Sequence, residues 1–124
     1  MKEITNADIM ERLTEVCVDT EKAAVGHLFD NIRAWGHDRG INNIDRQALK
    51  VFEEAGEMAR EVVRDNAVSD KFVDAIGDIL VSTIILADIA GYNAEDCLES
   101  AYNEIAPRTG KLLKGCFVKD SDLK

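Results

Sequence analysis

Two helical segments between residues 49 and 81 each carry a cluster of carboxylates, and this pattern constrains the chain more than any other. At about 100° per residue, the first segment places four glutamates on one face, namely Glu53, Glu54, Glu57 and Glu61. The opposite face is apolar and comprises Leu49, Phe52, Ala55, Ala59 and Val63. The second segment sets Asp74 and Asp78 one turn apart, in or beside a core stripe that continues through Val81 and Ile85.

A buried carboxylate costs several kcal/mol unless it takes up a proton or meets a cation. If the two segments pack antiparallel across a loop near residues 65 to 70, Glu54 and Glu57 can face Asp74 and Asp78. The result would be a concave site made only of oxygen ligands. Such a site suits Mg²⁺, with Mn²⁺ as a second candidate. The alternative is that the glutamates form an ordinary solvated surface.

Length and composition predict a single domain spanning residues 1–124, because 124 residues with 46% hydrophobic content can bury a core. The net charge of -9 argues against nucleic-acid binding, which needs lysine and arginine to displace phosphate counterions. An acidic protein that handles a polyphosphate must therefore recruit metal ions.

Cys17, Cys97 and Cys116 are widely spaced and contain no CxxC pair, which indicates neither a disulfide framework nor a zinc site. A reducing, cytoplasmic compartment is expected. The N-terminus lacks the apolar core of a signal peptide, and the apolar run from 79 to 87 is too short to span a bilayer. We therefore expect a soluble protein with no membrane partner.

The hydrophobic spacing predicts helices over residues 6–35, 45–65, 69–90 and 94–105, with a loop at 36–45. Asn6, Asp45, Ser69 and Asn93 are the expected N-caps. Gly26 is a point where the first helix could kink or split, and Gly91 is the expected C-terminal glycine cap of the third. Leu98, Ala101 and Ile105 are expected to face inward.

The expected fold is all-α, a four- to five-helix bundle. In the first helix, apolar and small residues repeat at intervals of three or four, namely Ile9, Leu13, Val16, Thr20, Ala24, Leu28, Ile32 and Trp35. The third helix is apolar nearly all round and needs cover on several sides, so we expect a homodimer or homotetramer assembled through helices. The C-terminal loop and tail, 106–124, concentrates basic residues and leaves room for a hairpin or extended stretch at 116–118.

Two other metal sites are disfavoured by the sequence. A di-iron bundle needs Glu-x-x-His on two helices, but the residues three before His27 and His37 are Ala24 and Ala34. No D-x-[DN]-x-[DN]-G loop is present, which excludes an EF-hand.

The segment from Trp35 to Lys119 resembles the MazG-like branch of the all-α nucleotide pyrophosphohydrolases, notably the short forms found in bacteriophages. Four motifs in order carry the resemblance: W…RGI (Trp35, Arg39, Gly40, Ile41), Q-x-x-K-x-x-E-E-x-x-E (Gln47, Lys50, Glu53, Glu54, Glu57), D-x-x-G-D (Asp74, Gly77, Asp78) and N…R-x-G-K (Asn103, Arg108, Gly110, Lys111). It covers about two-thirds of the chain.

The resemblance implies Mg²⁺-dependent hydrolysis of a (deoxy)nucleoside triphosphate to a monophosphate and pyrophosphate. It makes Glu54, Glu57 and Asp78 metal ligands, and Glu53 a further ligand or the group that orients the attacking water. The family's second acidic pair is commonly Glu-x-x-Asp, but Ala75 lies three residues before Asp78, so Asp74 must take that role.

Substrate contacts are expected from cationic, amide and aromatic side chains. Lys50, Arg108 and Lys111 suit the phosphates, Asn103 the sugar or a phosphate, and Trp35 the base by stacking. Two other functions stay open. One is a non-catalytic acidic helical interaction module, and the other is a related enzyme acting on phosphoribosyl-ATP.

Overall fold

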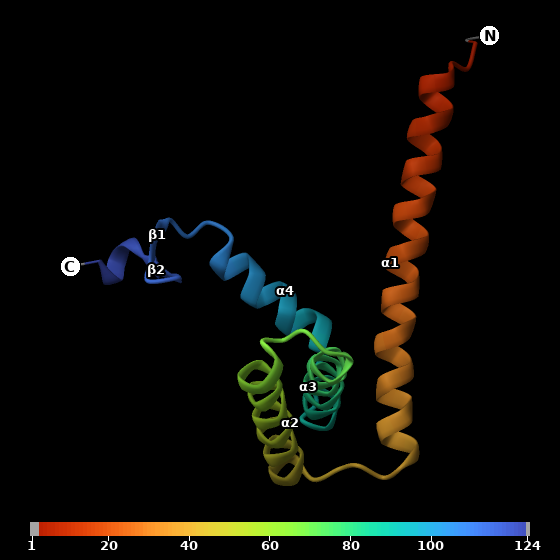
Figure 1. The fold of residues 1–124 in the computed structure, drawn as a ribbon. Coiled ribbons are helices and arrows are strands. Elements are labelled where there is room, and N and C mark those ends of the chain that lie inside the picture. Colours follow the sequence, from red (N-terminus) through yellow and green to blue (C-terminus); the bar gives the residue numbers. More distant parts are fainter. Residues whose placement is uncertain (1–2, 124) are drawn as a thin grey trace.

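The computed structural model describes residues 3–123, except for the side chains of residues 15–22. Its elements in chain order are α1 (Asn6–Asp38), α2 (Ile44–Asp65), α3 (Asp70–Ile89), α4 (Ala94–Ile105), β1 (Gly110–Leu113), β2 (Cys116–Lys119) and a short 3-10 helix η1 (Asp120–Asp122). The described chain is mostly helical, as predicted (Figure 1).

Each of the four α-helices begins with a side-chain cap. Ser69 and Asn93 accept the backbone N–H groups of Phe72 and Asp96, which confirms two predicted N-caps. The other two predictions were wrong by one or two positions. α1 is capped by Thr5 instead of Asn6, because Thr5 forms a reciprocal capping box with Asp8, and α2 is capped by Asn43 instead of Asp45.

α1 runs without interruption through Gly26 and ends at Asp38, so the helix does not split there and the loop that follows is shorter than predicted. A glycine within a helix costs about 1 kcal/mol relative to alanine. The neighbouring helical turns stabilise α1 enough for it to continue through Gly26. Gly91 has a φ of 87°, as expected of a C-terminal glycine cap. Val16, Cys17 and Thr20, parts of the sequence predictions, have side chains outside the described residues.

The central body consists of α2 packed antiparallel on α3, with the C-terminal part of α1 against the other side of α3 (Figure 1). α1 and α3 approach closely at Gly36, where a Cβ would lie 3.3 Å from side-chain atoms of Ile85. Ala75, Ile84 and Ile85 are the buried apolar side chains of the described chain. The core of a single chain is therefore small.

Both ends of the chain project from this body. The N-terminal half of α1 extends beyond α3, and α4 with the β1–β2 hairpin extends to the opposite side (Figure 1). We call residues 94–123 the C-terminal arm. Leu98 and Ile105 on α4 are 66% and 52% exposed, so the prediction that they face inward was wrong for the isolated chain, and Ala101 is exposed as well.

The hairpin pairs Gly110 with Lys119 and Leu113 with Cys116 through a two-residue turn. Lys114 and Gly115 both have positive φ, 50° and 79°, the combination that a type I′ turn requires. This confirms the extended stretch expected at 116–118. Gly110 lies against the Val118 carbonyl, where no Cβ would fit, so a glycine is required.

The accessible surface of the chain is 10273 Å² for a mass of 13.7 kDa. A compact monomer of that mass exposes about 6,600 Å². The difference, roughly 3,700 Å², consists largely of the two projecting ends and of apolar side chains left uncovered on the body. Cys97 and Cys116 are free, and no helix in the described part of the chain is long and apolar enough to cross a membrane.

Arg33 on α1 holds the start of α4 through two hydrogen bonds of 2.8 Å to Glu95, and it also contacts Asp30 at 2.6 Å. The Arg33 guanidinium lowers the pKa of Glu95 below its ordinary 4.5. We expect Arg33→Gln to reduce the free energy of unfolding by about 1 kcal/mol near neutral pH, since bidentate arginine pairs are among the stronger surface ion pairs.

The pH dependence has a defined sign. A carboxyl with a lowered folded-state pKa stabilises above its unfolded value and loses that contribution as the pH falls through the folded value. The difference between wild type and Arg33→Gln should therefore shrink below about pH 4, as measured by urea unfolding. A difference that stays constant from pH 7 to pH 3 would contradict the assignment.

Candidate functional site: carboxylates between α2 and α3

Glu54 is the one predicted ligand that the structure buries. Its residue is 5% exposed, on the face of α2 that packs on α3. Oε1 accepts a hydrogen bond from the Lys50 ammonium at 2.7 Å, and Oε2 is buried without a partner. That hydrogen bond is the main cause of a raised pKa at Lys50. A buried anionic oxygen without a donor is costly, which marks this oxygen as a place for a cation.

A pocket of about 320 Å³ opens beside Glu54, and we call it the aromatic pocket. Its lining residues are Trp35, Ile41, Gln47, Lys50, Glu54, Asp78, Val81, Ser82 and Ile85. Three elements therefore contribute: α1, α2 and α3, with Ile41 from the loop between α1 and α2. Its lining combines apolar side chains with two acidic residues, Glu54 and Asp78.

One hydrogen bond between α2 and α3 and one within α3 join polar residues that line the aromatic pocket. The buried Gln47 donates its Nε2 to the Ser82 carbonyl at 3.0 Å, and the Ser82 hydroxyl donates to the Asp78 carbonyl at 2.6 Å. At the rim, the Arg39 guanidinium lies 4.0 Å from the centre of the Trp35 ring, a cation–π distance. The indole is 47% exposed, so one of its faces is held by Arg39 and part of it remains open to a ligand.

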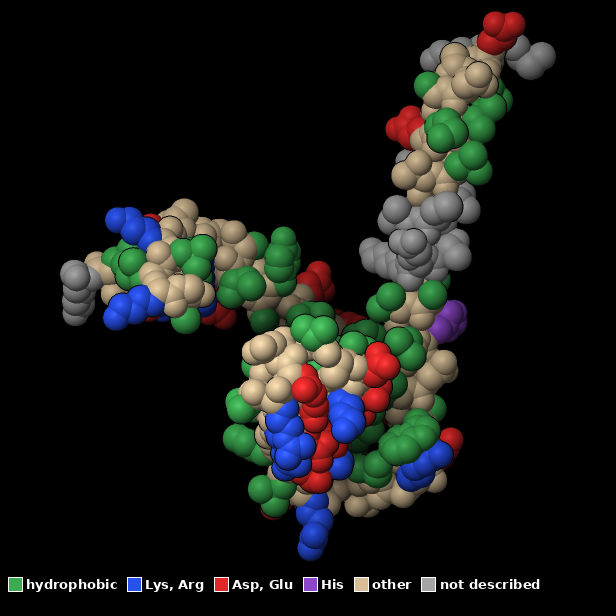
Figure 2. Space-filling view, viewed as in Figure 1, with side chains coloured by type: hydrophobic (Ala, Val, Ile, Leu, Met, Phe, Trp, Pro, Cys, Tyr) green, Lys and Arg blue, Asp and Glu red, His purple; other side chains and the backbone are tan. Residues whose placement is uncertain are grey.

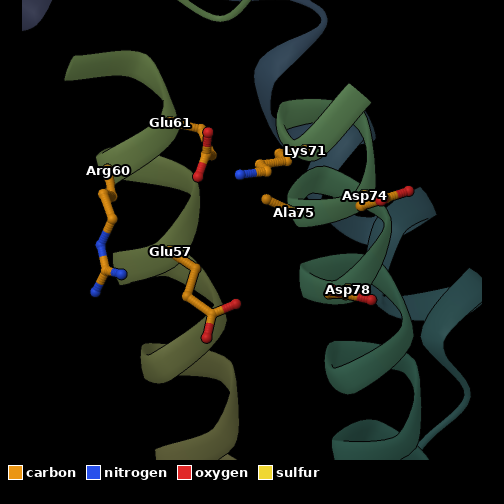
Figure 3. A pocket seen from close by; sticks show the side chains of 7 residues that line it. All are labelled: Glu57, Arg60, Glu61, Lys71, Asp74, Ala75 and Asp78. Atoms are coloured by element: carbon orange, nitrogen blue, oxygen red, sulfur yellow. The ribbon is translucent and has the colours of Figure 1, made fainter. Parts of the chain in front are cut away.

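A second hollow, the carboxylate cleft, lies further along the same two helices and has a volume of about 260 Å³. It is lined by Glu57, Arg60, Glu61, Lys71, Asp74, Ala75 and Asp78. In Figure 3, Glu57 points from α2 toward α3 and Lys71 points from α3 toward Glu61, whereas the carboxylates of Asp74 and Asp78 are directed away from α2. Asp78 lines both hollows and thus connects them.

The four predicted metal ligands lie on facing helices but do not converge. Within the described residues, no three acidic, histidine or cysteine side chains are close enough together to hold a metal ion. Asp74 and Asp78 are exposed, so they lie beside the core and not in it, and α3 turns Ala75 toward α2. Glu57 is exposed as well.

The predicted general-base or water-orienting residue, Glu53, lies on the outer side of Lys50. Its side chain is 59% exposed and its Oε2 lies 3.6 Å from the Lys50 ammonium. Lys50 therefore sits between Glu53 and Glu54, next to the aromatic pocket. The Lys50 ammonium is therefore the positive charge that already contacts these carboxylates.

Three predicted substrate contacts are far from these carboxylates. Asn103, Arg108 and Lys111 all lie on the C-terminal arm, which leads away from α2 and α3 (Figure 1). Arg108 pairs with Glu104 at 2.6 Å, and Asn103 is exposed. A single chain does not bring them to the carboxylates.

Several lining residues had no predicted role in the site, among them the polar residues Ser82, Arg60 and Lys71. Ser82 interrupts the apolar run of α3, and a hydroxyl at that position indicates a polar contact. Lys71 lies seven residues before Asp78, on the same face of a helix, which also was readable. For Arg60 the sequence carries no signal beyond a cation next to glutamates.

Removing the lysine tests whether Glu54 is a cation-binding group. We expect Lys50→Met to destabilise the chain without added metal, because both Glu54 oxygens then lack a cation. Millimolar Mg²⁺ or Mn²⁺ should raise the melting temperature of this variant more than that of the wild type, since the ion no longer competes with an ammonium. Calorimetric melting with and without metal measures both effects, and equal shifts in the two proteins would contradict the expectation.

Comparisons with models of known protein families, with curated proteins and with solved structures found no match to this chain.

Proposed function

We propose that this protein is a Mg²⁺-dependent pyrophosphohydrolase that converts (deoxy)nucleoside triphosphates to monophosphates and pyrophosphate. The observation that carries the proposal is Glu54, a buried carboxylate with an unpartnered oxygen beside a pocket that also contains Asp78. A fold that buries an anion at this cost has a use for it, and binding a cation is the simplest one. The motifs that resemble MazG-like enzymes support the same chemistry.

The donor atoms fit a hard divalent cation. Glu54, Glu57, Asp74 and Asp78 offer only carboxylate oxygens, the ligands that Mg²⁺ and Mn²⁺ prefer. The unpartnered Oε2 of Glu54 would be the first of these ligands, because it accepts no hydrogen bond in the described structure. When bound, the ion would neutralise charge on the phosphate oxygens and make a water molecule more acidic. No nucleophilic side chain is then required.

The residues around the carboxylates have separate tasks in this proposal. Lys50 can leave Glu54 when a metal replaces it and contact a phosphate, since its ammonium is half-exposed and its stem is flexible. Glu53, next to Lys50, would accept a proton from water or orient it. Trp35, steadied by Arg39, offers a face for a base at the rim of the aromatic pocket.

The proposal includes a homo-oligomer, a dimer or a tetramer built through the helices. α2 turns its acidic face inward, so its apolar face points outward, and Phe52 and Val63 are 78% and 84% exposed. We call three of the exposed apolar residues of α2, namely Leu49, Phe52 and Val63, the outer stripe. Obligate interfaces bury about 2,000–5,000 Å² in total, and the excess surface of this chain can supply such an interface.

A panel of nucleotides tests the function. The protein is incubated with each dNTP, each NTP and phosphoribosyl-ATP in the presence of Mg²⁺, and the products are separated by ion-exchange chromatography. The expected result is a monophosphate and pyrophosphate from at least one substrate, and loss of turnover in EDTA. Release of single orthophosphate, or no turnover with any substrate, would refute the proposal.

A second candidate is a non-catalytic helical interaction module, favoured by the unconverged carboxylates and the large exposed apolar surface. It predicts no turnover across the panel. It also predicts that the melting temperature either does not respond to Mg²⁺ or rises without any accompanying hydrolysis.

A further inference from the structure

The aromatic pocket and the carboxylate cleft lie one after the other along the same pair of helices. Both are lined by residues of α2 and α3, and Asp78 belongs to both linings. On α3, the aromatic pocket is lined by residues within 78–85 and the carboxylate cleft by residues within 71–78. We call the two hollows together the α2–α3 groove. Trp35 lies at one end of this groove and Lys71 at the other.

The two ends of the α2–α3 groove differ in chemistry. The aromatic pocket has four apolar or aromatic lining residues, namely Trp35, Ile41, Val81 and Ile85. Apart from Ala75, the described residues that line the carboxylate cleft are all charged. A nucleotide has the same polarity, because its base has apolar faces and its phosphates are anionic. If a metal ion holds the α-phosphate at Glu54 and Asp78, the base extends toward Trp35 and the other phosphates extend into the carboxylate cleft.

The carboxylate cleft supplies a cation for the phosphates beyond the first. Lys71 is exposed and forms no ion pair with any of the described residues. Its ammonium extends from α3 into the space between the two helices (Figure 3). Lys50, in contrast, is held by Glu53 and Glu54 at 3.6 and 2.7 Å. Arg60 runs along α2 and does not point toward α3 (Figure 3). Lys71 is therefore the lysine of the groove that can turn to a new anion without breaking an ion pair.

The spacing along α3 fits a phosphate chain. Lys71 lies seven residues before Asp78, which corresponds to about 10 Å along the helix axis at 1.5 Å per residue. The flexible four-carbon stem of the lysine covers part of this distance. The two phosphates beyond the α-phosphate cover the rest from the other side. The ammonium of Lys71 is thus suited to the terminal phosphate of a triphosphate and is too far away for the first.

The carboxylates near Lys71 make this binding depend on divalent ions. Figure 2 shows a band of acidic side chains on the α2–α3 body, with lysine and arginine side chains directly beside it. In the carboxylate cleft, four carboxylates outnumber Lys71 and Arg60, so a bare polyphosphate would be repelled. One bound divalent ion brings the side-chain charge of the cleft to zero. Lys71, which points toward Glu61 in Figure 3, then exchanges this carboxylate for a phosphate.

We propose that the α2–α3 groove binds its substrate in one direction, with the base at Trp35 and the terminal phosphate at Lys71, and that Lys71 selects triphosphates over diphosphates. The inference rests on the proposed function for the bond that is cleaved. Water attacks the α-phosphorus, the bond from this phosphorus to the α,β-bridging oxygen breaks, and pyrophosphate leaves from the end of the groove that holds Lys71. A diphosphate ends one phosphate earlier and does not reach this ammonium.

Affinity labelling tests the direction of binding without any turnover. The reagents are derivatives of dATP, dCTP, dGTP and dTTP with an acyl group on the γ-phosphate and a methylene group in place of the α,β-bridging oxygen, which prevents hydrolysis there. In the presence of Mg²⁺, a lysine amine beside the terminal phosphate attacks the acyl carbon and forms an amide. The bond from the acyl carbon to the phosphate oxygen breaks, the triphosphate leaves, and the proton of the amine passes to water.

Mass spectrometry of the digested protein identifies the acylated lysine. We expect Lys71 to be acylated by at least one reagent and to be protected by an excess of the same analogue without the acyl group. Protected labelling at Lys50 or Lys111 but not at Lys71 would overturn the proposal, because the terminal phosphate would then lie elsewhere. The absence of any protected label would overturn it as well.

Lys71→Gln tests the selection of triphosphates. Calorimetric titration in Mg²⁺ compares each α,β-methylene triphosphate with the corresponding diphosphate. The wild type should bind the triphosphate about tenfold more tightly, and Lys71→Gln should bind both with nearly equal affinity. The matched control is Arg64→Gln, which removes one positive charge from an exposed position on α2 outside both hollows and should keep the wild-type preference. An unchanged preference in Lys71→Gln contradicts the role of this lysine.

The outcomes separate this inference from the proposed function. Protected labelling of Lys71 and a preference for triphosphates that depends on Lys71, without turnover in the nucleotide panel, keep the direction of binding and refute the hydrolysis. Turnover in the panel with labelling elsewhere and an unchanged preference in Lys71→Gln keeps the proposed function and refutes the role of Lys71.

Discussion

Glu54→Gln is expected to lower kcat by at least about 100-fold while leaving the helical fold in place. Glutamine has nearly the volume of glutamate, so α2 can still pack on α3 at this buried position. Its neutral amide cannot bind a divalent cation as a carboxylate does. Lys50 loses one of its two carboxylate partners and keeps Glu53, and because it is half-exposed water can solvate its ammonium. The effect should therefore fall on catalysis far more than on stability.

Two measurements distinguish this result from general damage. Circular dichroism should show unchanged helicity, and Mg²⁺ should raise the melting temperature of the wild type but not of Glu54→Gln. Glu99→Gln, the same chemical change at an exposed position on α4, is the control and should retain full activity. Turnover by Glu54→Gln at the wild-type rate would remove Glu54 from the metal site.

Phe52→Glu is expected to dissociate the assembly. In the single chain the phenyl ring is 78% exposed, so a charge there has little effect on the monomer fold. At the centre of an interface made by the outer stripe, the same change would bury an unpaired carboxylate and weaken association by 100-fold or more, about 3 kcal/mol. Sedimentation velocity over a range of concentrations measures the shift from oligomer to monomer.

The control for Phe52→Glu is Arg64→Gln, which changes the charge by the same amount at an exposed position near the end of α2. It should leave the oligomer intact. If Phe52→Glu sediments like the wild type at every concentration, the outer stripe is not the interface. If the wild type itself is monomeric, the proposed homo-oligomer is wrong.

Helix positions were predictable from the sequence because local rules decide them. Single residues mark the helix ends. Ser69 and Asn93 cap the helices that follow them, and Gly91 adopts the positive φ found after α3. The errors of one or two residues at Asn6 and Asp45 arose because Thr5 and Asn43 are equally good caps slightly earlier in the chain. Nothing beyond a few neighbouring residues is needed for this level of structure.

The orientation of helix faces was harder to predict, because it depends on contacts between residues far apart in the sequence. On α2 the pattern of acidic and apolar faces was correct, but the acidic face carrying Glu54 packs inward and Phe52 points to solvent. On α4, Leu98 and Ile105 are more than half exposed. Periodicity identifies a face that must be covered but does not say whether the cover comes from the same chain.

The candidate site was predictable in its residue types but not in its geometry. Glu54 and Asp78 line one pocket, as their positions on facing helices suggested. Which of several carboxylates would be buried, and that Lys50 would occupy one of its oxygens, depend on side-chain rotamers that sequence spacing does not determine.

The close approach of Gly36 to Ile85 lies near the C-terminal end of α1, so a tilt of the helix about this contact would move its N-terminal end most. At 1.5 Å per residue, the far end of the helix lies about 45 Å from that contact, so a tilt of 5° displaces it by about 4 Å. A contact on the N-terminal half of α1 would therefore restrict the tilt of the whole helix to a few degrees. Trp35 is adjacent to Gly36, so the same restriction would set the width of the aromatic pocket at its mouth.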